Sequence, residues 1–300
     1  MKKIKTPAKN RIHTRSGSER VVFGIAFIIL AAIGLSYILS FFWGFLSALK
    51  THDEIILTPW QLPEKLNFIN FIDAFKLFEV NKTNMIGMIG NSLWLVAGGS
   101  VFSVFASTMM AYAVTKYEFP GRKLLITINI VIMTLPIIGS LPAQYRLFSK
   151  LGFINSPRIL LAYMGGFGSY NLFMCAFFRG VSQTYTEAAM IDGCGAFKTY
   201  FSIMLPNAKT ILLTGLIFSG VWYYNDYYLN TMFADKHSTL TVALSHLSMA
   251  IGEFVSLSDQ QLIMIRVQAG CLLVILPPML IYFFVQKKFT EGIERSGIVG

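Results

Sequence analysis

The feature that most constrains this chain is a series of apolar runs, each near the roughly 20 residues that an α-helix needs to cross about 30 Å of hydrocarbon. Only 13% of the residues are charged, so the chain lacks the charged surface that a soluble protein of 300 residues needs. Since lipid offers the backbone no hydrogen-bond partners, spanning segments have to form their hydrogen bonds internally, as helices do. The sequence therefore predicts an all-α integral membrane protein with six transmembrane helices. The runs cover about Val21–Leu49, Asn91–Val114, Leu124–Ala143, Ile159–Phe178, Lys209–Leu229 and Val267–Val285.

The basic residues indicate how these helices are oriented. They lie mainly in the N-terminal tail and in short connections between runs, so the net charge of +10 reflects membrane orientation and not nucleic-acid binding. Placing the N-terminus in the cytoplasm gives the inner side more Lys and Arg than the outer side. We therefore expect both termini to be cytoplasmic, although one outer connection holds Arg146, Lys150 and Arg158. The first run is too long for a signal-peptide core and lacks a small-residue cleavage site, so we expect it to be retained.

The chain divides by composition into three parts. Residues 1–20 form a basic cytoplasmic tail, residues 21–285 a six-helix transmembrane domain and residues 286–300 a cytoplasmic C-terminal tail. Neither a second domain nor an internal repeat is evident. The outer segment after the first run contains Pro59, Trp60 and mixed charges, which is typical of an interfacial loop with short helices.

Residues 182–208, between the fourth and fifth runs, carry the most informative pattern. Thr184 and Glu187 have the spacing of a capping box, which predicts a short helix. Gly193 and Gly195 then allow a turn with positive φ or a close backbone approach. A second helix follows with apolar residues at i, i+3, i+4 and i+7, and a proline ends or kinks it. Those apolar residues are Phe197, Tyr200, Phe201 and Met204, and the proline is Pro206.

Seven positions of this segment resemble the EAA loop of bacterial ABC importer permeases. That loop reads E-A-A, three residues, G, nine residues, then I-x-L-P, and several fixed residue types at fixed spacing make a specific signal. The matching positions are Glu187, Ala188, Ala189, Gly193, Ile203, Leu205 and Pro206. Without this resemblance, an amphipathic helix lying on the membrane surface would be the preferred interpretation.

The resemblance implies a role for the segment. In such permeases the EAA loop sits in a cleft of a cytoplasmic ATPase, so ATP and Mg are expected on a partner subunit, with no cofactor and no enzymatic activity on this chain. The carboxylate of Glu187 serves either as a contact to the partner or only as a helix cap. Coupling to the ATPase is assigned to Glu187, Ala188, Ala189, Asp192, Gly193, Phe197, Tyr200, Phe201, Leu205 and Pro206.

Other positions resemble the carbohydrate branch of the family, the maltose-type oligosaccharide permeases. The resemblance implies a multi-pass protein of the bacterial cytoplasmic membrane that imports a sugar. It also implies four kinds of partner: a homologous second permease, two cytoplasmic ATPase subunits, an extracellular substrate-binding protein and the sugar itself. The positions that carry it are Asn91–Leu93, Ala111–Ala113, Gly121, Arg122, Pro136, Pro142, Asp192, Trp222, Asn225, Asp226, Gln286–Phe289 and Gly292, whereas Cys194 departs from the usual alanine.

Polar and aromatic residues near the end of the fifth run admit two interpretations. They could line a sugar path, because aromatic faces stack on sugars and amide or carboxylate groups bond hydroxyls. They could equally form an aromatic belt and a hydrogen-bond network between helices. Both interpretations apply to Trp222, Tyr223, Asn225, Asp226 and, on the fourth run, Asn171.

Several other functions find no support in the sequence. A phosphate loop needs Gly directly before Lys, but Phe197 precedes Lys198, so this chain should not bind ATP itself. The three cysteines have neither disulfide nor metal-ligand spacing, and the four histidines are scattered. A secondary transporter would show paired broken helices, which the sequence does not reveal, and an intramembrane enzyme would need converging reactive groups. An ABC permease for an amino acid or phosphate remains the nearer alternative.

Overall fold

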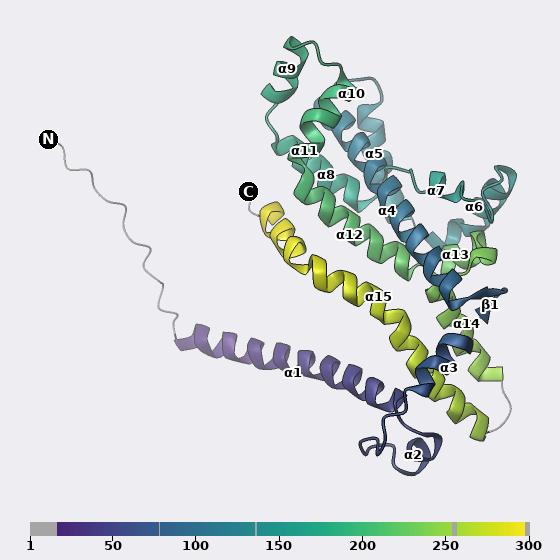
Figure 1. The fold of residues 1–300 in the computed structure, drawn as a ribbon. Helices are drawn as coiled ribbons and strands as arrows, with labels where there is room; N and C mark the ends of the chain where they lie inside the picture. The colour runs from purple at the N-terminus through teal and green to yellow at the C-terminus, as the bar shows by residue number, and fades with distance from the viewer. Residues whose placement is uncertain (1–16, 78, 136, 254–256, 298–300) are drawn as a thin grey trace. The chain divides into compact units, whose positions relative to one another are not determined.

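The computed structural model describes residues 17–77, 79–135, 137–253 and 257–297, which are helical over most of their length (Figure 1). The predicted all-helical class is confirmed, apart from a small hairpin of β1 (Glu79–Val80) and β2 (Thr83–Asn84), in which Val80 pairs with Thr83. The chain forms two compact units, Met1–Asn67 and Phe68–Gly300. Residues 1–16 of the expected N-terminal tail and 298–300 of the C-terminal tail lie outside the described residues.

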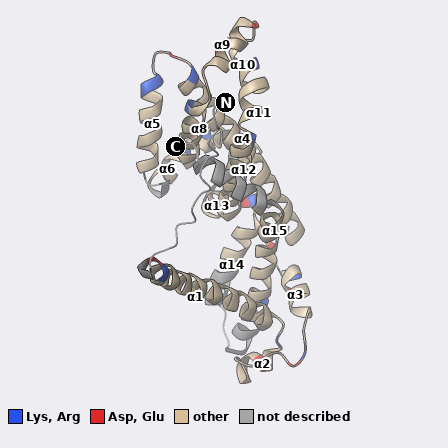
Figure 2. Ribbon diagram, turned by 90° about the vertical axis from the view of Figure 1, so that its left-hand side faces the viewer, with Lys and Arg blue, Asp and Glu red and all other residues tan. Residues whose placement is uncertain are grey.

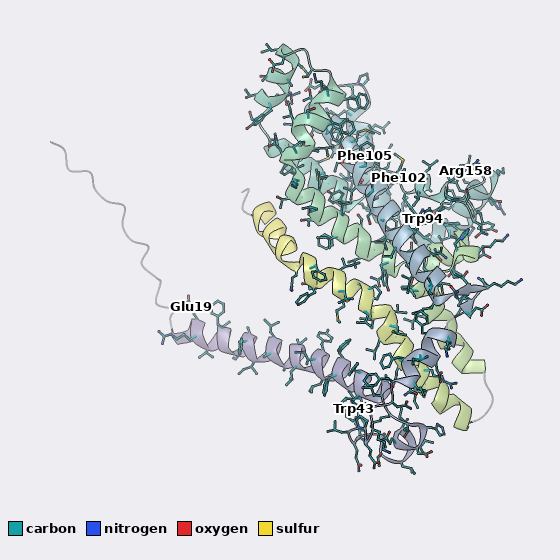
Figure 3. The ribbon with its side chains drawn as sticks, in the orientation of Figure 1. Glu19, Trp43, Trp94, Phe102, Phe105 and Arg158 are labelled. Carbon is teal, nitrogen blue, oxygen red and sulfur yellow. The ribbon has the colours of Figure 1, made fainter. Side chains whose placement is uncertain are left out.

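The first unit consists of one long helix and a structured loop. α1 (Gly17–Ala48) carries apolar side chains on every side (Figure 3), the pattern of a helix whose surroundings are lipid. In the loop, the nearly buried ammonium of Lys50 donates to the carbonyl oxygens of Thr58 and Pro59 at 3.2 and 2.7 Å. It also lies 5.0 Å from the ring centroid of Trp43, which stacks on Trp60. Aromatic and carbonyl contacts thus hold a buried charge at the end of α1.

A carboxylate organises the rest of this loop around α2 (His52–Leu57). Glu54 accepts hydrogen bonds from the backbone N–H groups of Thr51 and Glu64, at 2.7 and 2.6 Å. Because these bonds favour the charged form, they hold the pKa of Glu54 below its usual value. The ionised side chain therefore joins two parts of the loop that are ten residues apart.

Acid should open this loop. A carboxyl group with a lowered pKa stabilises the fold while it is ionised, and that contribution is lost as the pH falls through its folded pKa, below the ordinary glutamate value of about 4.3. We expect backbone amides of residues 51–64 to exchange faster once Glu54 is protonated, measured by hydrogen exchange with correction for the intrinsic pH dependence. Glu54→Gln should exchange fast at neutral pH as well; unchanged protection in that variant would contradict the assignment.

The second unit is built around α4 (Met85–Lys116). α4 packs against α8 (Ser169–Gly180) and α12 (Lys209–Asn225), and α12 packs against α15 (Leu257–Gly297). α15 in turn contacts α3 (Ile69–Leu77) and α14 (Leu240–Glu253). Each of α4 and α12 carries one charged residue, at its end, so both helices are tan along their length in Figure 2. Outside residues 182–208, the remaining short helices of this unit are α5 (Arg122–Thr134), α6 (Ile137–Lys150), α7 (Ile159–Ala162), α13 (Tyr228–Phe233) and η2 (Asp235–His237).

The count of six membrane-spanning helices stays a prediction, since the described residues contain fewer candidate spans. Among the described residues, three helices are long and apolar enough to cross a membrane, namely Glu19–Ala48, Met85–Lys116 and Met264–Phe284. The count rises to five if two bent pairs are each one span: Arg122–Thr134 with Gly139–Lys150, bent by 118°, and Ala196–Asn207 with Lys209–Asn225, bent by 83°. The fifth predicted run also stops early, because α12 ends at Asn225 and not at Leu229. The orientation of the termini stays a prediction.

The prediction of one continuous helix over Ile159–Phe178 is wrong. Residues 163–168 separate α7 from α8, with Gly166 and Gly168 at φ values of 68° and 122°. The side-chain oxygen of Asn129 on α5 accepts the Gly168 N–H at 2.6 Å, and its amide nitrogen donates to Asn171 at 3.2 Å. Non-helical backbone at membrane depth requires such protein partners. Glycines permit the break, and the buried side chain of Asn129 satisfies a backbone N–H group that the break leaves without a helical partner.

A second backbone group is paired by a neighbouring helix. Pro278 lies inside α15, and because proline has no N–H, the carbonyl of Val274 four residues earlier loses its helical donor. The hydroxyl of Tyr224 on α12 donates to that carbonyl. The contact between α12 and α15 therefore satisfies a group that lipid could not.

Glycines set how closely α8 and α12 approach. A Cβ added at Gly215 of α12 would lie 2.1 Å from the ring of Tyr170, whose hydroxyl donates to the carbonyl of Ile211. At Gly220 of the same helix an added Cβ would meet only ordinary contacts, at 3.5 Å from Val96. The two glycines are thus a matched pair that differ in the space around them.

Gly215→Ala should destabilise the folded protein by about 1–3 kcal/mol, the usual result of overpacking, because the Tyr170 ring has to move. Gly220→Ala should leave stability nearly unchanged. Reversible unfolding of both purified variants in mixed detergent micelles would measure the difference. Equal stability of the two variants would contradict the packing argument.

Candidate functional site

The 182–208 segment forms the predicted helix, turn and helix. α9 (Thr184–Ile191) ends in a turn at Gly193, which has a φ of 72°. The N–H of Gly193 donates to the carbonyl of Met190 at 3.0 Å, and that of Cys194 to Ala189 at 2.8 Å. This pair of bonds is the Schellman arrangement, which needs a left-handed residue and so favours glycine. The turn predicted at Gly193 is confirmed, whereas Gly195 has an ordinary φ of −71° with open space around it.

The capping box predicted for Thr184 and Glu187 is wrong. α9 begins at Thr184 itself, so this residue lies inside the helix, and its N–H donates to the hydroxyl oxygen of Ser182 at 3.2 Å. The N–H of Glu187 donates to the carbonyl of Gln183. The first turn is therefore satisfied by residues that precede the expected cap, which leaves the Glu187 side chain exposed.

The four apolar residues predicted to share one face of the second helix do not share it: two are buried and two are exposed. α10 (Ala196–Thr199) passes into a π-helical turn, η1 (Tyr200–Met204), where the N–H of Leu205 donates to the carbonyl of Tyr200 five residues earlier. This wider turn changes the angular spacing of the side chains. Tyr200 and Met204 are buried, with exposures of 1% and 0%, whereas Phe197 and Phe201 are 71% and 50% exposed.

Helical structure continues through Pro206 in α11 (Leu205–Asn207), since proline is tolerated in the first turn of a helix. The bend of 83° follows at Ala208, before α12. Leu205 is half-buried and Pro206 is exposed. In α9, Ala189 is buried at 2% exposure, while the remaining polar and small residues of the motif, Glu187, Ala188, Asp192 and Gly193, are exposed.

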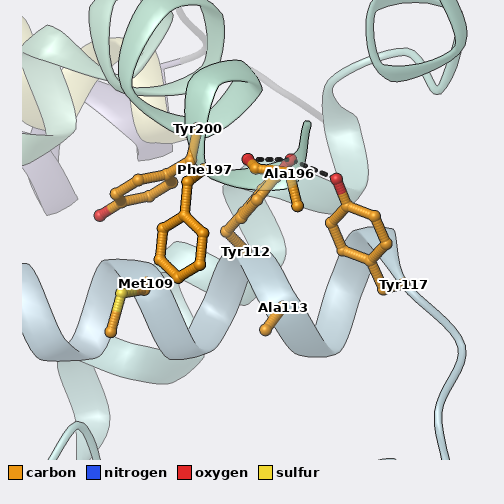
Figure 4. A pocket seen from close by; sticks show the side chains of 7 residues that line it. All are labelled: Met109, Tyr112, Ala113, Tyr117, Ala196, Phe197 and Tyr200. Atoms are coloured by element: carbon orange, nitrogen blue, oxygen red, sulfur yellow. Dashed lines mark hydrogen bonds between the residues drawn. The ribbon is translucent and has the colours of Figure 1, made fainter. Parts of the chain in front are cut away.

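A small cavity of about 230 Å³ lies where this segment meets α4 (Figure 4). The hydroxyl of Tyr112 lies between the Tyr117 hydroxyl, at 2.7 Å, and the carbonyl oxygen of Ala196, at 3.3 Å. The Tyr200 ring lies 5.3 Å from that of Tyr112. The cavity, here called the Tyr112 cavity, is lined by Met109, Tyr112, Ala113, Tyr117, Ala196, Phe197 and Tyr200.

A larger cavity of about 520 Å³ lies at the C-terminal end of α12. Of the residues that sequence reasoning assigned to a sugar path, Trp222, Asn225 and Asp226 line it together, and Trp222 is 60% exposed. A backbone N–H, that of Leu229, donates to the Asp226 carboxylate at 3.0 Å. We call this the Trp222 cavity; it is lined by Leu141, Phe218, Val221, Trp222, Asn225, Asp226, Tyr227, Tyr228 and Leu229.

The other two residues assigned to the path lie elsewhere. Tyr223 is 8% exposed, and its ring centroid lies 4.7 Å from that of Tyr163. Asn171 is 2% exposed and donates to the carbonyl of Ser107 on α4 at 2.9 Å, besides its bond to Asn129. Asn171 therefore bonds across helices, and Tyr223 packs against a second aromatic ring.

Metal and thiol chemistry find no built site in the part of the chain that the structure describes. No group of three His, Cys, Asp or Glu side chains there is arranged to hold a metal ion. The three cysteines are free and separate, with Cys175 buried in the packing between α4 and α8.

Comparison with known proteins decides the family. Residues 99–294 match the family described as "Binding-protein-dependent transport system inner membrane component", which is about two thirds of the chain. The chain belongs to this family. It is therefore a membrane permease component and not an enzyme, and it works in a transport system that depends on a binding protein.

Two relatives illustrate where this permease lies within the family. It is 30% identical over 212 residues to the maltodextrin transport system permease protein MdxG of Bacillus subtilis, covering 70% of this chain and 74% of the relative. It is 22% identical over 283 residues to the diacetylchitobiose uptake system permease protein NgcG of Streptomyces coelicolor, covering 94% and 90%. One solved structure, a chain of a bacterial ABC transporter involved in the import of the acidic polysaccharide alginate, matches with a TM-score of 0.72 at 20% identity, over 92% of this chain and 99% of that one. That likeness shows the permease fold.

Sequence reasoning missed the residues of α4 that hold the 182–208 segment. Thr108 and Tyr112 bond to it through their side chains, and the carbonyl of Lys116 accepts a hydrogen bond from Gln183. Their spacing of four residues predicts that they lie on one face of a helix. Their residue types, however, do not indicate which segment of the chain they contact.

The turn at Gly193 makes a direct test of this part of the permease. Gly193→Ala places a side chain in the left-handed region and should cost the turn about 1–2 kcal/mol. The expected result is faster amide exchange in a peptide covering Ala189–Cys194, measured by hydrogen exchange with mass spectrometry. Gly193→Asn should restore much of the protection, since Asn tolerates this region, and Gly195→Ala should have little effect. Equal exchange in the two alanine variants would contradict the assignment.

Proposed function

We propose that this chain is one of two permease subunits of an ATP-driven importer that carries oligosaccharides across the cytoplasmic membrane. The observation that carries the proposal is its alignment, over most of its length, with permeases named for maltodextrin and diacetylchitobiose. Both are oligosaccharides, which favours a sugar over the amino acid or phosphate alternative.

The proposed complex has four further components. A homologous second permease completes the membrane pathway, two cytoplasmic ATPase subunits bind ATP and Mg, and an extracellular binding protein delivers the sugar. Both termini of this chain then lie in the cytoplasm, which puts the 182–208 segment on the side of the ATPases. This chain itself needs no cofactor.

Exposed residues of the 182–208 segment suit contact with an ATPase. Glu187 presents a carboxylate for backbone or basic donors, and the exposed methyl group of Ala188 lets another backbone approach closely. Phe197 and Phe201 offer apolar surface beside them, at 71% and 50% exposure. An exposed patch of aromatic side chains indicates a surface that binds another protein. We assign the contact to α9 and to the exposed side of α10 and η1, with Asp192 and Pro206 at its edges.

The Trp222 cavity suits the sugar pathway. Trp222 presents an aromatic face to the carbon-bound hydrogens of a pyranose ring, and Asn225 and Asp226 supply groups that bond hydroxyls. Predominantly apolar walls with a few polar groups are the usual make-up of a ligand site. Tyr223, the neighbour of Trp222 in α12, packs against Tyr163, and Asn171 holds α8 to α4.

Transport requires the permease pair to have two conformations. Closure of the ATPases over ATP favours the outward-facing one, in which the pathway accepts sugar from the binding protein, and ATP hydrolysis returns the inward-facing one. The ATPases can drive this exchange only because they bind the two states differently.

The decisive experiment is affinity purification of the tagged chain from native membranes in mild detergent. We expect an ATPase, a second permease and a binding protein to co-elute, with ATP hydrolysis that depends on the complex. Uptake into proteoliposomes can then be screened with maltotriose, galactooligosaccharides and diacetylchitobiose. A chain that purifies alone and transports without nucleotide would overturn the proposal.

Substitution of Trp222 tests the sugar pathway. Trp222→Ala should reduce uptake of the sugar identified in the screen by about 2–10-fold, as expected for losing an aromatic contact of about 0.5–1.5 kcal/mol. Trp222→Phe should retain more activity. The control is Phe173→Ala, which removes an exposed aromatic ring of α8 outside the cavity. Equal uptake by Trp222→Ala and Phe173→Ala would exclude Trp222 from the pathway.

A further inference from the structure

Three buried polar residues form one row along the C-terminal half of α4. Thr108, Tyr112 and Lys116 are spaced by four residues, so their side chains lie on the same face, each one turn beyond the last. Their exposures are 0%, 4% and 9%. Around them the core is apolar, with Met174, Phe178 and Met204 among its members. A buried polar row in an apolar core needs partners. Thr108 and Tyr112 have theirs in the 182–208 segment, and the Lys116 side chain has its partner at Val181, the residue just before that segment. We call the row the α4 ladder.

The first two members hold the C-terminal part of the segment. The hydroxyl groups of Thr108 and Tyr200 are 2.7 Å apart and share a hydrogen bond. One turn further along α4, the Tyr112 hydroxyl donates to the carbonyl oxygen of Ala196 at 3.3 Å (Figure 4). Both partners belong to the continuous helical stretch of α10 and η1, so two bonds fix the register of that stretch against α4.

The third member holds the N-terminal part. The ammonium of Lys116 donates to the carbonyl oxygen of Val181 at 2.5 Å, directly after the end of α8. A cation is favourable there because carbonyl groups at a helix C-terminus carry partial negative charge. In return, the side-chain amide of Gln183 donates to the carbonyl of Lys116 at 3.5 Å. Gln183 near the start of the segment, and Ala196 and Tyr200 in its second half, are therefore bonded to the same three turns of one helix.

We propose that the α4 ladder positions the 182–208 segment and transmits its movement to the transmembrane helices; the proposal rests on the ATPase contact of the proposed function. Phe197 and Phe201 face outward from the same helical turn whose Tyr200 faces inward. A force on the exposed aromatic residues is therefore passed to Thr108 through one rigid turn. Apolar contacts alone would let this turn slide, whereas directional hydrogen bonds oppose sliding.

The experiment removes single hydroxyl groups without changing the shape of the side chain. Thr108→Val and Tyr112→Phe delete the two ladder bonds to α10 and η1. Thr115→Val and Tyr117→Phe are matched controls, since Thr115 bonds only its own helix and Tyr117 bonds Tyr112 without reaching the segment. Thr108→Ser retains the hydroxyl and serves as the rescue.

Movement at the far end of α12 is followed through a reporter cysteine. Val221→Cys lines the Trp222 cavity and is 51% exposed, and the native cysteines are replaced by serine in this background. The rate of labelling by a polar maleimide is measured on the co-purified complex with and without a non-hydrolysable ATP analogue. ATP hydrolysis and co-elution of the ATPase are measured on the same preparations.

The proposal expects the nucleotide to change the labelling rate in the wild-type, control and Thr108→Ser proteins. In Thr108→Val and Tyr112→Phe this change should fall by at least about fivefold, while the ATPase still co-elutes and still hydrolyses ATP. A merely structural role would not separate hydrolysis from movement in this way.

Two outcomes would overturn the proposal. One is a wild-type labelling response in both ladder variants; the other is loss of ATPase co-elution in both, which would mean that the bonds maintain the fold and do not transmit movement. Failure of the proposed function itself is distinguishable, because it would appear as a wild-type chain that brings no ATPase with it.

Discussion

The pairing of backbone groups that lipid cannot satisfy is the constraint on which the rest of this structure depends. An unpaired N–H or C=O group in hydrocarbon costs several kcal/mol, so the backbone groups that a break in a helix leaves free need hydrogen-bond partners elsewhere in the protein. Asn129 supplies one for the break before α8, by accepting the N–H of Gly168. Tyr224 supplies one for α15, by donating to the carbonyl that Pro278 leaves without a donor. These polar contacts also determine which helices are neighbours, since each partner comes from a different helix.

Close approach between helices is the second condition, because apolar surface gains little from leaving lipid for another helix. Small residues allow this close approach because they leave space for an aromatic ring of the neighbouring helix. Gly215 accepts the ring of Tyr170, and at Gly99 an added Cβ would lie 2.9 Å from the ring of Tyr223. Each ring then makes a further polar or aromatic contact, as Tyr223 does with Tyr163. Glycine positions in α4 and α12 therefore do more to fix the packing than the many interchangeable leucine and isoleucine side chains.

Sequence reasoning predicted what depends on residues close together in the chain. The turn at Gly193 is such a case, since a glycine after a short helix already implies the left-handed conformation. It failed where a distant residue determines the local conformation. Residues 163–168 contain three glycines, which are compatible with a break in the helix, but nothing near them in the chain indicates that Asn129 accepts the Gly168 N–H. It also failed where two local options compete, as at Thr184, whose place in the helix was set by the hydroxyl of Ser182. The π-helical turn likewise separated Tyr200 from Phe201 on a face that regular periodicity had joined.

The α4 helix links the two candidate sites within one continuous element. Its ladder begins at Thr108, and Gly99 lies nine residues earlier, about 14 Å along the axis at the rise of an α-helix. There the Tyr223 ring packs on the α4 backbone, and the next residue, Trp222, lines the larger cavity. A shift of α4 along or around its axis would press on that ring, since no side chain at Gly99 separates the two helices. α4 is held by directional bonds near its C-terminal end and contacts the Tyr223 ring through bare backbone near its middle, so a displacement at one contact reaches the other through continuous helix. The Trp222 cavity would then change shape whenever the 182–208 segment moves.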